Sequence, residues 1–185
     1  EAVETAIKLA RLRTGRQKII GFFGAFHGRT YGAMTLTASK PVQRKGYGPF
    51  VPEILHTHYA YCYRCPVNRD PASCSVECLE LLTESYFHHS VDPEEVAAII
   101  VEPVQGEGGF IPPHKDFLPR LQDLCRANGI LQIADEVQCG MGRTGKLFAY
   151  EPFGVDPDMI ILAKGIASGM PLAAVIARDD VMKWN

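Results

Sequence analysis

The fold is decided by residues 97–134, which read AAIIVEPVQGEGGFIPPHKDFLPRLQDLCRANGILQIA. The stretch opens and closes with a short apolar run, and between them lies a helical pattern over 116–128 with its apolar side chains on one face. Asp116 can cap the start of this helix, and Gly129 can end it. A strand, a helix and a strand at this spacing predict a βαβ unit with two parallel strands and a right-handed crossover.

Further apolar runs extend this unit into a sheet. They are uniformly apolar rather than alternating, which indicates that both faces of the sheet are covered. The five predicted strands are 18–23, 97–101, 130–134, 159–163 and 173–177. Only nine residues separate the last two, too few for a helical crossover, so we expect these strands to be antiparallel or not adjacent. The predicted fold class is α/β.

The composition of the chain excludes several classes of protein. Its 185 residues are 46% hydrophobic with a formal net charge of −2, so neither disorder nor attraction to nucleic acid or an anionic membrane is indicated. No apolar run approaches the roughly 18 residues of a membrane helix. Six cysteines are too few for a secreted disulfide scaffold. We expect a cytoplasmic protein with reduced thiols or thiol metal ligands, and no nucleic-acid or membrane partner.

Both ends of the chain predict a piece of a longer protein. A helical pattern over 1–10 starts at the first residue without an initiator Met, and Gly15 supplies its stop signal. Residues 181–185 begin another element at the opposite end. We therefore expect an internal fragment that encodes only part of an active site.

Chemically active side chains follow four of the predicted strands. Phe26 and His27 come after the first strand, Glu102 after the second, Asp135 after the third and Lys164 after the fourth. In open α/β sheets, ligands bind outside the carboxyl ends of the strands. A charged residue at one strand end can simply mark where the chain reaches water. Four such ends in glycine-rich loops favour a common site.

Lysine and aspartate are the most informative of these residues. An amine that is desolvated after an apolar strand, as predicted for Lys164, can attack a carbonyl and form a Schiff base. A carboxylate at a buried strand end, as predicted for Asp135, needs a cationic partner. That partner is either a ligand, such as a protonated pyridine nitrogen, or the side chain of Arg143 in a structural ion pair.

Two glycine-rich stretches need separate interpretations. Residues 140–145, GMGRTG, match the dinucleotide fingerprint, but five residues separate them from the preceding strand and Pro152 soon follows. We interpret them as a turn near a ligand phosphate or a subunit contact. Residues 102–109, EPVQGEGG, form either a solvated loop or a loop wrapped on a ligand.

Four cysteines lie in an irregular stretch without clear periodicity. Cys62, Cys65, Cys74 and Cys78 have spacings that suit Zn²⁺ or an iron–sulfur cluster. They can equally be reduced, partly buried thiols in a surface excursion. The sequence leaves these alternatives open.

Four ordered blocks resemble the class III (ω-amino acid) aminotransferases, and most closely the 4-aminobutyrate aminotransferase group. They are FHGRTYGA (26–33), EPVQGEGG (102–109), ADEVQCGMGRTGKLFA (134–149) and ILAKGIASGMPLAAVIAR (161–178). The resemblance implies that residues 1–185 are part of the large, cofactor-binding domain of a fold-type I pyridoxal-phosphate enzyme, with a cysteine-containing excursion at about 46–80. It also implies a homodimer of longer chains, with the phosphate loop just upstream of Glu1.

The resemblance also implies roles for the residues around the cofactor, pyridoxal 5′-phosphate. Lys164 would form the Schiff base with it and later shuttle the proton, and Asp135 would pair with its pyridine nitrogen. Phe26 and Val137 would pack on the two faces of its ring, and Gln138 would lie near its phenolic oxygen.

Other roles implied by the resemblance lie further from the ring. Glu102 and His27 would support the site, and Glu107 would be the switching glutamate that partners an arginine. That arginine, and a threonine of the partner subunit, would come from the part of the protein after residue 185. The pair Cys62 and Cys65 is similar to the iron–sulfur site of some mitochondrial 4-aminobutyrate enzymes.

The implied activity is transfer of an amino group from an ω-amino acid, such as 4-aminobutyrate, to a 2-oxo acid, such as 2-oxoglutarate. Alternatives are an acetylornithine or ornithine aminotransferase, or a racemase, aminomutase or decarboxylase on the same fold. A metal-binding interaction fragment is the non-enzymatic alternative. We expect the 185 residues alone to be catalytically weak or inactive, because substrate-binding parts are missing.

Overall fold

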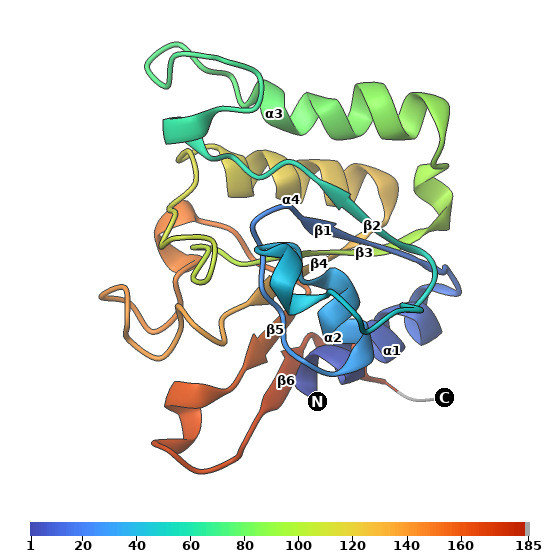
Figure 1. Ribbon diagram of the computed structural model, residues 1–185, viewed down its shortest axis with the longest axis vertical. Coiled ribbons are helices and arrows are strands. Elements are labelled where there is room, and N and C mark those ends of the chain that lie inside the picture. The colour runs from blue at the N-terminus through green and yellow to red at the C-terminus, as the bar shows by residue number, and fades with distance from the viewer. Residues whose placement is uncertain (184–185) are drawn as a thin grey trace.

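The computed structural model describes residues 1–183, so residues 184–185 of the element expected at 181–185 lie outside the described residues. The chain forms one six-stranded sheet with helices on both faces (Figure 1). The strands are β1 (Lys18–Phe22), β2 (Ile54–Thr57), β3 (Val96–Val101), β4 (Leu131–Asp135), β5 (Met159–Leu162) and β6 (Ala174–Ala177). The helices are α1 (Ala2–Thr14), α2 (Tyr31–Leu36), α3 (Glu77–Glu80) with a π-helical continuation (Leu81–Phe87), α4 (Phe117–Asn128) and α5 (Asp179–Met182).

The strand order in the sheet is β2-β1-β3-β4-β5-β6. Strands β1 to β5 are parallel, and β6 is antiparallel to β5. The predicted βαβ unit is confirmed as β3-α4-β4, with Ala98 opposite Leu131 in the register. Of the two alternatives predicted for the last two strands, the structure shows the antiparallel one, and the α/β class is confirmed.

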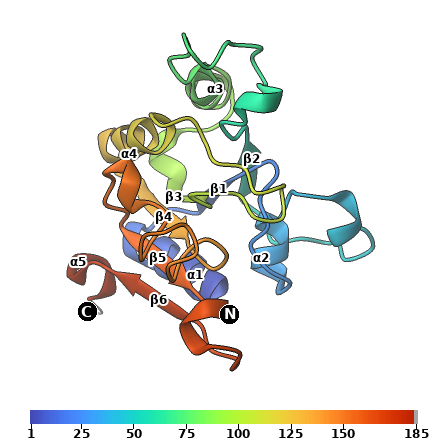
Figure 2. The same cartoon turned by 90° about the vertical axis from the view of Figure 1, so that its left-hand side faces the viewer.

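The two faces of the sheet carry different helices. One face packs against α3 and α4, with Phe22, Leu82 and Phe117 fully buried there. The other face packs against α1 and α2, where Ile19 and Leu36 have no exposed surface. Figure 2 shows the helix pairs on opposite sides of the sheet. Because both faces are covered, the strands are uniformly apolar, as the sequence predicts.

The predicted helix ends are confirmed at their carboxyl termini. Gly15 and Gly129 adopt left-handed conformations with φ of 69° and 62°, which a side chain at Cβ would disfavour. Asp116 precedes α4, but its side chain makes no capping hydrogen bond. That prediction is wrong because the Asp116 backbone is helical (φ −91°, ψ 0°) rather than extended as a capping residue requires.

The stretch expected to be irregular is partly regular. β2 forms the sheet edge beside β1, and α3 with its continuation covers one face. β2 has only four residues, three of them half-buried, so its sequence lacks the apolar run of the other strands. No helix within residues 1–183 is long and apolar enough to cross a bilayer.

Candidate functional site

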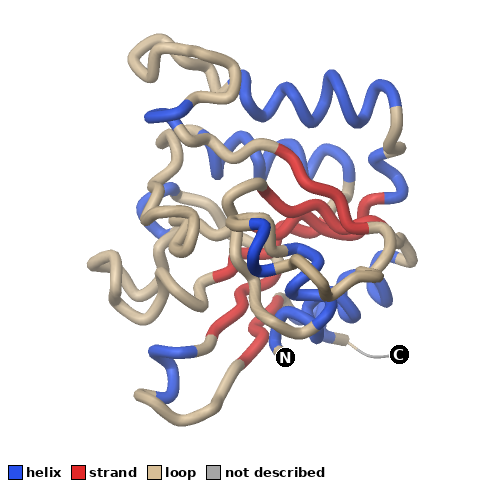
Figure 3. Tube along the Cα trace, in the orientation of Figure 1, coloured by secondary structure: helices blue, strands red, loops and turns tan. Residues whose placement is uncertain are grey.

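Long loops gather at the carboxyl ends of the parallel strands (Figure 3). A pocket of about 120 Å³ lies at this edge of the sheet. Its lining residues are Phe26, His27, Gly28, Glu102, Asp135, Val137, Gln138 and Lys164. Every residue predicted to contact the cofactor therefore lines one pocket, although these residues come from the ends of four different strands.

Asp135 is the last residue of β4 and is buried, with 2% of its surface exposed. One of its oxygens, Oδ2, lies 2.7 Å from Nδ1 of His27. The other, Oδ1, accepts a hydrogen bond of 3.0 Å from the Val137 backbone N–H. Among the described ion pairs, the partner of Asp135 is thus His27 and not Arg143, which is exposed.

His27 is held between two acidic side chains. Burial alone would lower the pKa of His27, but the hydrogen bond and charge of Asp135, together with the charge of Glu102, raise the pKa overall. Its other ring nitrogen, Nε2, is buried without a hydrogen-bond partner in the described structure. His27 therefore points its Nδ1 at Asp135, which fixes the orientation of this carboxylate.

Lys164 begins a short 3₁₀ turn two residues after β5 ends. Its φ of 49° is left-handed, a strained conformation for a residue with a side chain and one that is enriched at functional sites. The amine Nζ donates a hydrogen bond of 2.5 Å to Oε1 of Gln138. The predicted desolvation of Lys164 is wrong for the described residues, because Lys164 lines the pocket but is exposed.

Glu102 connects two loops beneath the pocket. Its oxygens accept hydrogen bonds of 2.8 Å from the Phe26 N–H and 2.9 Å from the Gly106 N–H. Burial raises the pKa of Glu102, and the nearby charge of Asp135 raises it further. Glu102 therefore positions the loop that carries Phe26 against the loop after β3.

Glu107 is the one predicted site residue that the structure does not bring into the pocket. It is exposed, and its carboxylate lies 3.4 Å from Nζ of Lys40. Gly106, just before it, lies against Gln138: a Cβ atom there would come within 2.7 Å of Cγ of Gln138. The 102–109 loop thus packs on the pocket through Gly106.

Two further residues, which were not predicted from the sequence, support the pocket. Tyr59, which follows β2, donates its hydroxyl to the backbone carbonyls of Glu102 and Pro103, at 3.1 and 3.2 Å. Glu136 is buried and accepts a hydrogen bond of 3.0 Å from the Tyr150 N–H. A buried carboxylate directly after Asp135 was visible in the sequence, whereas Tyr59 follows a strand that the sequence did not reveal.

The two other motifs take simpler forms. Residues 140–145 form a turn rather than the start of a helix, which confirms that they are not a dinucleotide fingerprint. All six cysteines are free thiols. Within residues 1–183, no three His, Cys, Asp or Glu side chains are arranged to hold a metal ion.

The chain is similar to known proteins over its whole length. The family model described as "Aminotransferase class-III" matches residues 1–185. The 4-aminobutyrate aminotransferase of Mycobacterium tuberculosis is 44% identical over 185 residues, 98% of this chain and 41% of that protein. The alanine/serine racemase of Pyrococcus horikoshii is 42% identical over 186 residues, 98% of this chain and 39% of that protein.

Solved structures agree with this similarity. A PLP-bound amine transaminase from an uncultivated Pseudomonas species superposes with a TM-score of 0.89 at 35% identity, over 97% of this chain and 42% of that one. The described chain thus spans about two fifths of the length of the proteins that it matches.

Proposed function

Because the chain belongs to the class III aminotransferase family, we propose that the full-length protein transfers an amino group from an ω-amino acid to a 2-oxo acid, with pyridoxal phosphate as cofactor. One observation carries the proposal: Asp135 and Lys164 line the same pocket. The proposed cofactor is one small aromatic molecule, so the carboxylate that would pair with its ring nitrogen and the amine that would bind its aldehyde must lie in the same pocket.

The chemical groups that line the pocket are those that this cofactor requires. A buried carboxylate, a primary amine and the apolar side chains of Phe26 and Val137 surround one space. The space of about 120 Å³ is smaller than the roughly 300 Å³ of ordinary ligand pockets. We propose that the remaining walls come from the rest of the full-length chain and from a second copy in a homodimer.

The mechanism assigns separate tasks to the residues of the pocket. Pyridoxal phosphate, when bound, supplies an aldehyde that condenses with amines and a ring that takes up electrons. Asp135, oriented by His27, would keep a proton on the ring nitrogen. Phe26 and Val137 would hold the ring, and Gln138 would bind its phenolic oxygen.

Lys164 would bind the aldehyde and then move the proton. With the cofactor and an amino donor bound, the Nζ of Lys164 would accept a proton from the amine-bearing carbon of the donor, hold it and return it in the transfer. Proton transfer by a positioned side chain typically contributes 10²–10⁴-fold to the rate. Gln138, which accepts a hydrogen bond from Nζ, would keep the amine directed into the pocket.

An amine-donor panel on the full-length protein tests the proposed function. The donors are 4-aminobutyrate, N-acetylornithine, ornithine and β-alanine, each with and without 2-oxoglutarate. We expect consumption of an ω-amine that requires the oxo acid. Absence of acceptor-dependent turnover with every donor would refute the transaminase proposal.

Similarity to an alanine/serine racemase supports a second candidate, racemisation of an amino acid at the same site. A racemase needs no acceptor, because the proton returns to the carbon from which it was taken. Inversion of L-alanine or L-serine without an oxo acid would favour this candidate. The two activities are therefore separated by the same panel when these amino acids are added to it.

A further inference from the structure

The backbone of Lys164 is held in a conformation that it would not adopt by itself. Its φ of 49° is left-handed, and a residue with a side chain keeps such a conformation only where the surrounding structure imposes it. The 3₁₀ turn that Lys164 begins has only four residues. The next residue, Gly165, packs against Met141, since a Cβ atom at position 165 would come within 3.1 Å of Cβ of Met141. Met141 therefore supports the chain directly after Lys164.

Met141 lies in an irregular turn over residues 139–150, which we call the 139–150 turn. This turn comes after β4 and contains no helix or strand. At its tip, the Gly142 N–H donates a hydrogen bond of 3.2 Å to the Leu147 carbonyl. Ordering irregular backbone costs conformational entropy, so the position of Met141 depends on the contacts that hold the base of the turn.

The side chain of Glu136 joins both ends of the 139–150 turn. Its Oε2 accepts a hydrogen bond from the thiol of Cys139, whose Sγ lies 3.2 Å away. Its Oε1 accepts a hydrogen bond of 3.0 Å from the N–H of Tyr150. The backbone carbonyl of Glu136 also accepts a hydrogen bond of 2.9 Å from the Gly140 N–H. One residue therefore fixes the first and the last residue of the turn relative to each other.

Glu136 is a buried acid that has no part in the pocket itself. It has 1% of its surface exposed and does not line the pocket. No ion pair in the described part of the chain, residues 1–183, includes it. Burial raises the pKa of Glu136, and the backbone hydrogen bonds at Ala149 and Tyr150 offset this only in part. Because an apolar side chain would avoid the cost of burying an acid, packing alone does not account for a glutamate here.

We propose that Glu136 is a positioning residue for Lys164. Its carboxylate ties both ends of the 139–150 turn, and the turn holds Met141 against Gly165. This contact keeps the backbone of Lys164 left-handed, so that its amine meets the pocket beside Gln138. The inference rests on the proposed function in that Lys164 is the residue that binds the cofactor.

A pH titration of the colour of the full-length holoenzyme tests this role. Lys164 and the cofactor would share a nitrogen, and the proton affinity of that nitrogen depends on the angle at which the lysine presents it to the ring. We expect Glu136→Ala to move the midpoint of the colour change by about one pH unit, a tenfold change in proton affinity. We also expect kcat to fall about 10–100-fold with little change in KM. An unmoved midpoint in Glu136→Ala would overturn the proposal.

Two further variants separate positioning from charge and from general stability. Glu136→Gln keeps an oxygen for the Tyr150 N–H and places an amide beside the Cys139 sulfur, so we expect it to retain the wild-type midpoint. Gln122→Ala removes another buried polar side chain, which donates a hydrogen bond of 2.7 Å to the Asp156 carbonyl and does not line the pocket. We expect Gln122→Ala to lower stability without moving the midpoint. A shift like that of Glu136→Ala in either variant would contradict the positioning role.

A double-mutant cycle tests the route through Met141. Met141→Gly removes the Cβ that contacts Gly165, and we expect it to move the midpoint as Glu136→Ala does. If both variants act on Lys164 through the same contact, the double variant should show about the shift of one single variant rather than the sum of the two. Additive shifts would show that Glu136 does not act through Met141, which would overturn the proposal.

Competitive acetylation of the cofactor-free full-length protein gives a readout that does not depend on the proposed function. Lys115, which is exposed, serves as the internal reference. Gln138 holds the amine of Lys164 in the wild type, so we expect labelling of Lys164 relative to Lys115 to rise several-fold in Glu136→Ala. An equal ratio in wild type and Glu136→Ala would overturn the inference. Absence of colour in the wild type would refute the proposed function alone, because the acetylation still tests the role of Glu136.

Discussion

The hydrogen bond between His27 and Asp135 is the central contact at the scale of single residues. It joins two buried side chains that are 108 positions apart in the sequence, at 2.7 Å. The sequence placed both at strand ends, so their common location was predictable. Their pairing was not, because Arg143 was the protein partner that the sequence suggested for Asp135, and only the packing of the strands brings His27 to it instead. The exposure of Lys164 was likewise unpredictable from its apolar neighbours.

Replacing Asp135 by Asn should cost most of the activity of the full-length enzyme. The amide is neutral and cannot hold a proton on a ring nitrogen, so we expect turnover to fall by about 10²–10³-fold, as for loss of one preorganised electrostatic group. Asp123→Asn, at an exposed position of α4, is the matched control. The measurement is turnover at saturating cofactor, and equal rates for both variants would contradict the role of Asp135.

The raised pKa of His27 makes the stability of the protein depend on pH. A group whose pKa is higher in the folded than in the unfolded state stabilises the fold below its ordinary value, here 6.5, and loses this contribution as pH rises through the raised value. His27→Asn keeps a donor for Asp135 but does not titrate. We expect the difference in unfolding free energy between wild type and His27→Asn to be largest below pH 6.5.

Unfolding of the two full-length proteins in urea over a pH series measures this difference. The control is His88→Asn, at an exposed position, which should leave the pH dependence of the wild type unchanged. A difference between wild type and His27→Asn that grew with rising pH would have the wrong sign for a histidine stabilised by its acidic neighbours.

At the scale of elements, the site depends on loops that pack closely against each other. Uniformly apolar runs revealed five strands, because β-strands covered on both faces need no polar residues. β2 could not be predicted from the sequence, because its four residues include the polar His56 and Thr57. The helical turns from Glu77 onward could not be predicted either, because their apolar residues follow no clear period. The conformations of the loops could not be predicted either, since nothing in the sequence showed that Glu107 would pair with Lys40 outside the pocket.

Gly106 provides a test of how the 102–109 loop supports the pocket. The added Cβ of Gly106→Ala would meet Cγ of Gln138 at 2.7 Å and displace the side chain that holds Lys164. We expect about 10–100-fold lower activity, since small displacements of positioning groups have effects of this size. Gly48→Ala, where no atom lies within 4 Å of the added Cβ, is the control, and equal activity of both variants would contradict the argument.

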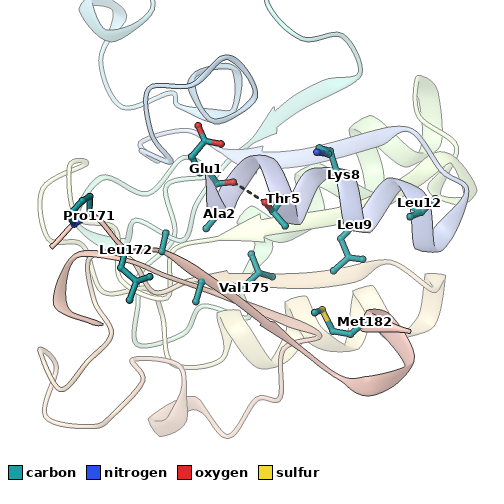
Figure 4. A pocket seen from close by; sticks show the side chains of 12 residues that line it. Glu1, Ala2, Thr5, Lys8, Leu9, Leu12, Pro171, Leu172, Val175 and Met182 are labelled. Atoms are coloured by element: carbon teal, nitrogen blue, oxygen red, sulfur yellow. Dashed lines mark hydrogen bonds between the residues drawn. The ribbon is translucent and has the colours of Figure 1, made fainter. Parts of the chain in front are cut away.

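At the scale of the whole molecule, the described chain supplies only part of the walls of the proposed active site. The pocket has about 120 Å³, a groove of about 980 Å³ between α1 and β6 exposes apolar side chains (Figure 4), and relatives are more than twice as long. The sequence predicted the α/β class and the common location of the site, because both follow from the order of strands and loops. It could not predict the groove, which depends on the strand order and on the face that α1 occupies.

Residues 1–185 expressed alone should show little or no turnover. The remaining walls of the pocket would be absent, so we expect activity at least about 10²-fold below that of the full-length protein. The comparison uses the donor that is best in the full-length protein, at equal concentrations of chain. Turnover by the short chain at a similar rate would show that the described residues hold the complete site.

The central claim is that Lys164 binds the aldehyde of a cofactor whose ring nitrogen lies at Asp135. Treating the full-length holoenzyme with borohydride reduces the bond between cofactor and lysine, and peptide mapping then identifies the modified residue. We expect the label on Lys164 and loss of the yellow colour in Lys164→Ala. A label on any other lysine, with Lys164 unmodified, would contradict it.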